Sequence, residues 1–136
     1  VFLCCNLETT PKFEVDVIIR PIVGPEVITG STRMKAGTAT KLILNMLSTA
    51  TMIKLGKVYE NLMVDLKAMN AKLTDRAERI IMAITSVSRD DAKKLLTDAY
   101  GNAKVAIVMQ KLVIDYAEAK KRLDANGGFI RKVLQQ

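Results

Sequence analysis

One polar run of the sequence holds most of the side chains that could do chemistry. Ser31 and Thr32 supply hydroxyl groups, Arg33 a planar guanidinium and Lys35 an ammonium, and Gly30 permits close backbone approach. The run lies between an apolar, strand-like segment and a helical pattern. Free backbone N–H groups and the positive end of the dipole at a helix start bind anions. The run therefore predicts a site for a small anion such as a phosphate group.

The same side chains also admit a purely structural interpretation. Ser31 or Thr32 would then cap the helix, while Arg33 and Lys35 lie in solvent. The role of Glu26 has three interpretations. It could be a general acid or base, an acceptor for hydroxyl groups of a ligand, or an ion-pair partner of Arg33. Chemistry alone favours the ion pair.

Residue usage excludes several classes of site. Histidine is absent, which removes Ser–His and Cys–His nucleophilic pairs and the commonest zinc ligand. The two cysteines, Cys4 and Cys5, are adjacent and would point to opposite faces of a strand, so we expect buried small hydrophobic residues and no metal site. Any acid or base chemistry would fall to carboxylates or lysine.

The net charge of +7 is concentrated in the middle of the chain, where residues 31–72 hold seven basic and two acidic side chains. Aromatic residues make up only 4% of the sequence, so stacking on nucleic-acid bases has little support and we expect no nucleic-acid partner. A small anion is the better-sized partner. A solvated, lysine-rich face remains the alternative.

Short apolar runs at residues 1–5 and 15–20 predict two strands, buried on both faces as in a parallel sheet covered by helices. From residue 36 to about 55 the apolar spacing predicts a helix that stops at Gly56. Residues 57–70 form a connector for which a helix is one interpretation. The position of the anion site at the junction of strand and helix follows from this order.

Beyond the connector the pattern predicts a small helical bundle. Apolar stripes with helical spacing occur at Ala77, Ile80, Ile81 and Ile84, at Ala92, Leu95, Leu96 and Ala99, and at Val105, Val108, Met109 and Leu112. Two pairs resemble capping boxes, Ser88 with Asp91 and Asp115 with Glu118. Residues 126–128, Asn-Gly-Gly, predict a helix end and a turn into a last apolar segment.

The chain opens with Val1 and an apolar run, which indicates a sequence cut from something longer. That run lacks the basic region and cleavage site of a secretory signal, and no apolar stretch approaches the roughly 20 residues that span a bilayer. We therefore expect a cytoplasmic protein with no membrane partner.

Residues 24–41, Gly-Pro-Glu-Val-Ile-Thr-Gly-Ser-Thr-Arg-Met-Lys-Ala-Gly-Thr-Ala-Thr-Lys, continue into residues 44–49 and 56–65. Together these segments closely resemble the C-terminal half of the N-acetylmuramic acid 6-phosphate etherase family. Residues 70–73 and 128–131 also resemble that family, so the likeness extends over nearly the whole chain.

The resemblance implies an α/β fold in two parts. Residues 1–69 would be the C-terminal portion of a sugar isomerase (SIS) domain, with a parallel sheet and flanking helices. Residues 70–136 would be a small, all-α, ubiquitin-associated-like (UBA-like) bundle. It further implies a homodimer without metal or organic cofactor, whose partner is a phosphorylated amino sugar.

The implied activity is that of a lyase in the recycling of cell-wall sugars. It would cleave the D-lactyl ether of N-acetylmuramic acid 6-phosphate to N-acetylglucosamine 6-phosphate and D-lactate. The family's first phosphate-binding loop and its two acid/base glutamates lie upstream of this chain, so the chain alone would lack turnover. What carries over is substrate binding by Ser31, Thr32, Arg33 and Lys35, with Glu26 as a sugar-contacting or structural carboxylate.

Two other functions remain open. The glucokinase regulatory protein shares much of the Ser-Arg-Met-Lys run, which would make the parent a non-catalytic phosphosugar sensor. Residues 71–136 could also be a protein-interaction module, although their apolar stripes are more simply a core.

Overall fold

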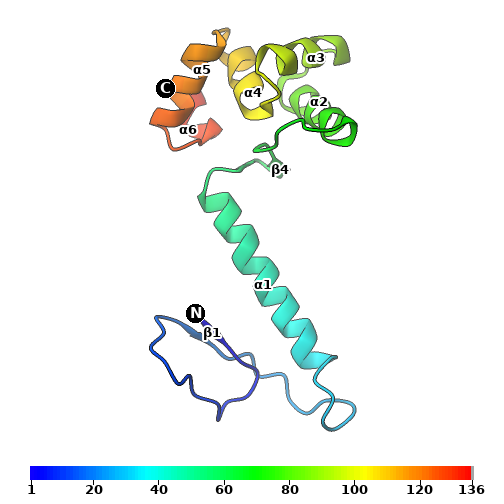
Figure 1. Cartoon of the computed structure of the whole chain (residues 1–136), viewed down its shortest axis with the longest axis vertical. Helices are drawn as coiled ribbons and strands as arrows, with labels where there is room; N and C mark the ends of the chain where they lie inside the picture. Colours follow the sequence, from blue (N-terminus) through cyan, green and yellow to red (C-terminus); the bar gives the residue numbers. More distant parts are fainter. Residues whose placement is uncertain (136) are drawn as a thin grey trace. The chain divides into compact units, whose positions relative to one another are not determined.

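The computed structural model describes residues 1–135 and is of mixed α/β type (Figure 1). It divides into two compact units, unit 1 (Val1–Ala50) and unit 2 (Thr51–Gln136). Unit 1 begins with two short strands, β1 (Phe2–Leu3) and β2 (Ile18–Ile19), which pair in parallel. The backbone N–H of Phe2 donates to Val17 O at 2.9 Å, and that of Cys4 donates to Ile19 O at 3.1 Å. Both predicted strands are therefore confirmed, in shorter form.

The expected burial of these strands on both faces is wrong for this chain. None of residues 1–50 is buried, and Val17 and Ile18 remain 48% and 44% exposed. The physical reason is that a two-stranded sheet flanked by one helix has too few neighbours to remove both faces from water. The parallel pairing that the apolar runs indicate is nevertheless present.

Helix α1 (Lys35–Lys54) lies within a residue of the predicted bounds. Its end is a Schellman motif: Gly56 N–H donates to Ile53 O at 3.0 Å and Lys57 N–H donates to Met52 O at 3.1 Å. Gly56 takes the left-handed φ of 66° that this motif requires. The predicted helix stop is confirmed.

The connector after α1 is an antiparallel hairpin of β3 (Val58–Tyr59) and β4 (Leu62–Met63), so the helical interpretation of residues 57–70 is wrong. Glu60 in its turn has a left-handed φ of 52°, which ends any helical path. Val64, directly after β4, is completely buried. Burial of this β-branched side chain ties the end of the hairpin to the core of unit 2.

The rest of unit 2 is helical, with α2 (Ala71–Thr85), α3 (Arg89–Asp98), α4 (Ala103–Leu112), α5 (Tyr116–Ala125) and α6 (Ile130–Leu134). Helix α4 contacts each of the other four and lies between the α2–α3 pair and the α5–α6 pair (Figure 1). The core is drawn from the predicted stripes, including Ile81, Leu96, Val105 and Val108. The bundle prediction is confirmed.

The helix starts follow side-chain chemistry. The N-cap side chain of Ser88 accepts a hydrogen bond from Asp91 N–H, and that of Asp115 accepts one from Glu118 N–H, as the capping pairs predict. Asn70 and Asn102 cap α2 and α4 in the same way, and these two caps were not among the predicted ones. The predicted domain boundary between residues 69 and 70 stays a prediction. The division into two compact units falls within α1, between Ala50 and Thr51, and reflects only which residues pack together.

Within residues 1–135 no helix combines the length and apolarity that a bilayer crossing requires.

Candidate functional site

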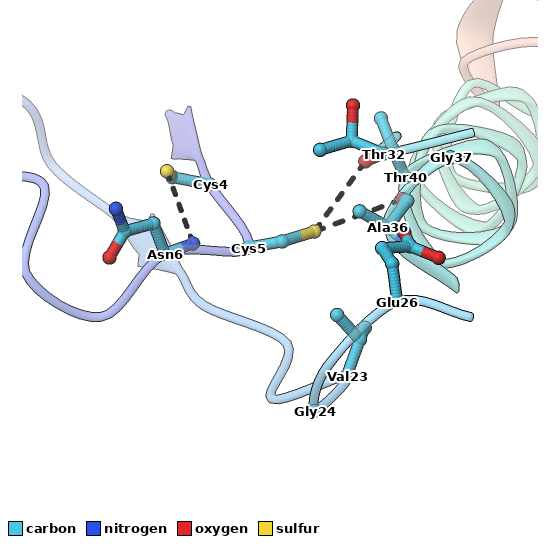
Figure 2. Close-up of a pocket in the computed structure, with 10 residues that line it drawn as sticks. All are labelled: Cys4, Cys5, Asn6, Val23, Gly24, Glu26, Thr32, Ala36, Gly37 and Thr40. Atoms are coloured by element: carbon cyan, nitrogen blue, oxygen red, sulfur yellow. Dashed lines mark hydrogen bonds between the residues drawn. The ribbon is translucent and has the colours of Figure 1, made fainter. Parts of the chain in front are cut away.

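A cavity of about 560 Å³ opens in unit 1 where three chain segments meet (Figure 2). Cys4, Cys5 and Asn6 follow β1, Val23 and Gly24 follow β2 after a short gap, and the first turns of α1 close the third side. The carboxyl ends of parallel strands and the start of the next helix are where α/β proteins place ligands. The lining residues are Cys4, Cys5, Asn6, Val23, Gly24, Glu26, Thr32, Ala36, Gly37 and Thr40.

Glu26 caps the helix that borders this cavity. Its Oε2 accepts the backbone N–H of Lys35 and its Oε1 accepts that of Ala36, both at 3.0 Å. These two hydrogen bonds, the one from Ala36 foremost, hold the pKa of the Glu26 carboxyl below its ordinary value of 4.5. The carboxylate is therefore ionised at neutral pH and complements the positive end of the helix dipole.

The ion pair between Glu26 and Arg33 that chemistry alone favoured is not formed: the ion pairs among residues 1–135 involve neither of these two side chains. The helix start offers two backbone donors in fixed positions, whereas an exposed guanidinium must lose side-chain entropy to hold a carboxylate. Ser31 and Thr32 likewise do not serve as the side-chain cap, because Glu26 takes that place from nine residues upstream.

Lys35 forms the second link between the loop and the helix. Its Nζ donates to the backbone oxygen of Pro25 at 2.7 Å, next to the residue whose carboxylate accepts from the backbone of Lys35. Side chain and backbone are thus bonded to consecutive loop residues. Three hydrogen bonds, which join Pro25 and Glu26 to Lys35 and Ala36, therefore fix the path of the loop against the start of α1.

The five predicted binding residues are not brought together around one cavity. Glu26 and Thr32 line the cavity at the strand ends, and the backbone oxygen of Thr32 accepts Gly37 N–H at 2.9 Å. Ser31 and Arg33 instead line a separate hollow of about 470 Å³ with Val27, Ile28 and Met34. Lys35 contacts the loop. Whether all five bind substrate stays a prediction.

The cysteines are only partly buried, so the expectation that both are buried hydrophobic residues is wrong. Cys5 Sγ lies 3.8 Å from Ala36 O and 3.8 Å from Thr40 Oγ1, and Cys4 Sγ accepts the backbone N–H of Asn6 at 3.4 Å (Figure 2). The cause is the shortage of neighbours in unit 1, where none of residues 1–50 is buried, and both cysteines directly follow β1. That position beyond a parallel strand is the signal that would have identified Cys5 and Asn6 as lining residues, whereas Thr40 lies in the first turns of α1.

The chemistry of the cavity follows from its polar groups. Glu26 is its one charged lining residue, and the Thr32 and Thr40 hydroxyls and the Asn6 amide can exchange hydrogen bonds with a polar ligand. The cations of residues 24–41, which are Arg33, Lys35 and Lys41, are not among the residues that line the cavity. Within residues 1–135, no group of three or more histidine, cysteine or acidic side chains lies close enough together to hold a metal ion. The arrangement can exchange hydrogen bonds with a polar ligand.

No protein-family model matches the chain, but curated proteins match it along its length. An N-acetylmuramic acid 6-phosphate etherase of Serratia proteamaculans (strain 568) is 52% identical over 132 residues, which are 97% of this chain and 44% of that protein. N-acetylmuramic acid 6-phosphate etherase 2 of Vibrio cholerae is 46% identical over the whole chain and 44% of its own length. An etherase of Alkaliphilus metalliredigens is 49% identical over 99% of the chain and 44% of its own length.

The chain thus spans less than half the length of the curated relatives it matches. Within that span, roughly every second residue is the same, and the match includes both residues 24–41 and the helices of unit 2. Identity of this extent along essentially the whole chain establishes common descent. The chain belongs to the N-acetylmuramic acid 6-phosphate etherase family.

Proposed function

We propose that this chain is part of a lyase that cleaves the D-lactyl ether of N-acetylmuramic acid 6-phosphate, giving N-acetylglucosamine 6-phosphate and D-lactate in cell-wall sugar recycling. The observation that carries the proposal is the match of 46% to 52% identity to proteins bearing the etherase name, over 97% to 100% of the chain. The cavity at the strand ends and the start of α1 supports it, because that place in an α/β fold takes polar ligands.

In the proposed reaction a carboxylate removes the proton at sugar C2 and an acid protonates the departing lactyl oxygen, which leaves a double bond in the sugar. Water then adds to the unsaturated intermediate. The acid and base are glutamates of the part of the family protein that this chain does not include. The chain alone is accordingly inactive, and its contribution is to bind and orient the substrate.

The proposed binding residues act by charge and position. Arg33 and Lys35 neutralise the phosphate group, and the hydroxyls of Ser31 and Thr32 donate to its oxygens. Glu26 occupies the backbone donors at the start of α1, so it fixes the loop and presents its remaining lone pairs to sugar hydroxyls. The fold proposed for residues 1–69 is the end of a SIS domain, and residues 70–136 form a UBA-like bundle. The functional state proposed is a homodimer.

The test uses a chimaera in which this chain replaces the matched region of the Serratia proteamaculans etherase. With N-acetylmuramic acid 6-phosphate as substrate, we expect D-lactate release at a rate within about tenfold of that relative. A folded, monodisperse chimaera that binds the phosphosugar but releases no D-lactate would favour the non-catalytic sensor. A folded chimaera that does neither would refute the proposal.

A further inference from the structure

The hollow of about 470 Å³ that Arg33 lines, here called the Arg33 hollow, combines side chains of two opposite kinds. Three are apolar, and they are well exposed: Val27 at 78%, Ile28 at 71% and Met34 at 61%. Two are polar, the Ser31 hydroxyl and the Arg33 guanidinium. The hollow therefore has apolar walls beside a hydroxyl donor and a permanent positive charge.

A tight turn of the loop shapes this hollow. The backbone N–H of Ser31 donates to Ile28 O at 3.0 Å, and Gly30 has a left-handed φ of 86°, as the third position of a type II turn requires. Arg33 follows two residues after the turn, and α1 begins at Lys35. All five lining residues thus come from one short local segment, residues 27–34.

The charge of Arg33 is not paired by the described chain. The ion pairs among residues 1–135 do not include it, and the carboxylate of Glu26 accepts two backbone N–H groups instead. A guanidinium presents a planar fork of N–H donors that fits a carboxylate with two parallel hydrogen bonds. Beside apolar walls, such a fork suits an anion that carries an apolar group of its own.

The proposed substrate has three substituents that differ in this respect. Its phosphate group is anionic but has no apolar part. Its N-acetyl group has a methyl group but no charge. The D-lactyl group bears a methyl group and a carboxylate on the same carbon atom, so it alone matches both the apolar walls and the cation of the Arg33 hollow.

The Arg33 hollow adjoins the cavity at the strand ends. Glu26 and Thr32 line the cavity, and the residues that directly follow them, Val27 and Arg33, line the hollow. Consecutive Cα atoms are about 3.8 Å apart, so the two spaces share this loop as a wall. One sugar can therefore contact both, with its ring at the cavity and one substituent in the hollow.

We propose that the Arg33 hollow binds the D-lactyl group, with the carboxylate on Arg33 and Ser31 and the methyl group against the three apolar side chains. The inference rests on the proposed function, which supplies the substrate. It gives Arg33 and Ser31 the carboxylate in place of the phosphate, which is left to Lys35 and Thr32. Arg33 then distinguishes substrate from product, because N-acetylglucosamine 6-phosphate has lost the lactyl group.

The experiment compares substrate with product on the chimaera that carries this chain. The inhibition constant of N-acetylglucosamine 6-phosphate reports on the phosphate and N-acetyl contacts but not on a lactyl contact. We expect Arg33→Ala to raise KM for N-acetylmuramic acid 6-phosphate about tenfold or more and to leave that inhibition constant within about twofold. Lys35→Ala should raise both, because both ligands carry the phosphate. An equal rise of both constants with Arg33→Ala, or a change in neither, would overturn the proposal.

Two exposed isoleucines give a matched test of the apolar walls. Ile28 lines the hollow, whereas Ile22 is 79% exposed and does not line it. We expect Ile28→Thr to raise KM about threefold or more, with the inhibition constant of the product unchanged, because apolar contact with the lactyl methyl group is lost. Ile22→Thr should change neither constant. Equal effects of the two substitutions on KM would contradict an apolar contact in the hollow.

Calorimetry separates this inference from the proposed activity. If the chimaera binds N-acetylmuramic acid 6-phosphate but releases no D-lactate, the lyase function fails. The dissociation constants of the two phosphosugars then replace KM and the inhibition constant, and Arg33→Ala should weaken only the ligand that has the lactyl group. A chimaera that releases D-lactate, but loses affinity for both ligands equally on Arg33→Ala, would overturn the inference alone.

Discussion

At the start of α1 the carboxylate of Glu26 takes the place that a ligand anion would take at a free helix terminus. The backbone N–H groups of Lys35 and Ala36 already donate to its two oxygens. A phosphate group bound nearby must therefore rely on side-chain donors rather than on these two backbone groups. Among the predicted residues, Lys35 has the charge and the reach for that contact, because its Nζ extends back over the loop to Pro25.

Substitution of Lys35 by alanine in the chimaera tests this role. We expect KM for N-acetylmuramic acid 6-phosphate to rise about tenfold or more, with kcat changed by less than about threefold, since a phosphate contact is made equally in ground and transition states. Steady-state D-lactate release gives both constants. Lys41→Ala, at another exposed lysine of the same helix, is the control and should leave both constants unchanged. A loss confined to kcat would contradict a binding role.

At the scale of elements, an ion-pair network joins the hairpin of unit 2 to α4. Asp65, after β4, accepts from Lys57 Nζ at 2.9 Å and from Lys104 Nζ at 3.1 Å. Lys104 is buried, so its charge depends on this partner. Burial raises the pKa of Asp65, but the hydrogen bonds and charges of Lys57 and Lys104 outweigh it and keep the pKa below the ordinary value of 3.8.

A depressed carboxyl pKa has a definite consequence for stability. Because Asp65 binds its proton more readily in the unfolded chain, its contribution is complete at pH values above 3.8 and is lost as the pH falls through the folded pKa. We expect Asp65→Asn to lower the free energy of unfolding of the chain by about 1–2 kcal/mol at pH 7, a value reduced for the partial exposure of Asp65. Urea unfolding at pH 7 and at pH 3 measures it.

The difference between wild type and Asp65→Asn should shrink at pH 3. Asp124→Asn is the matched control, because Asp124 pairs with Lys120 one helical turn away at the surface. That exposed pair should contribute little to stability, because solvent screens it. A pH-independent effect of Asp65→Asn, or an equal effect at Asp124, would show that the network does not stabilise unit 2.

At the scale of the whole molecule, one unit has a core and the other has none. Ile107 in α4 is completely buried, whereas Ile18 in β2 is 44% exposed. We expect Ile107→Ala to destabilise unit 2 by about 2–5 kcal/mol and Ile18→Ala to change the chain by less than about 1 kcal/mol. Native-state hydrogen exchange separates the units, since amides of unit 2 should exchange by global unfolding and those of unit 1 should not. Slow exchange in unit 1 of the isolated chain would contradict this division.

The helical unit was the part most fully predictable from sequence. Buried positions such as Ala77, Ile81 and Leu96 recur with helical spacing, and Ser88 and Asp115 carry the cap chemistry of their own helices. Such signals are local, because a helix satisfies its hydrogen bonds within itself and a cap acts over three residues. Local signals failed at the hairpin, where pairing between β3 and β4 and the burial of Val64 decide the backbone path.

The sequence by itself determined the family, the helices of unit 2, the stop at Gly56 and the segment that carries the candidate site. Only the tertiary structure decided that Glu26 caps α1, that Cys5 faces Thr40, and that Ser31 and Arg33 lie at a different hollow from Thr32. The physical reason is range. Propensity, capping and apolar spacing act between residues a few positions apart, whereas a cavity depends on which distant backbone groups are brought within hydrogen-bonding distance.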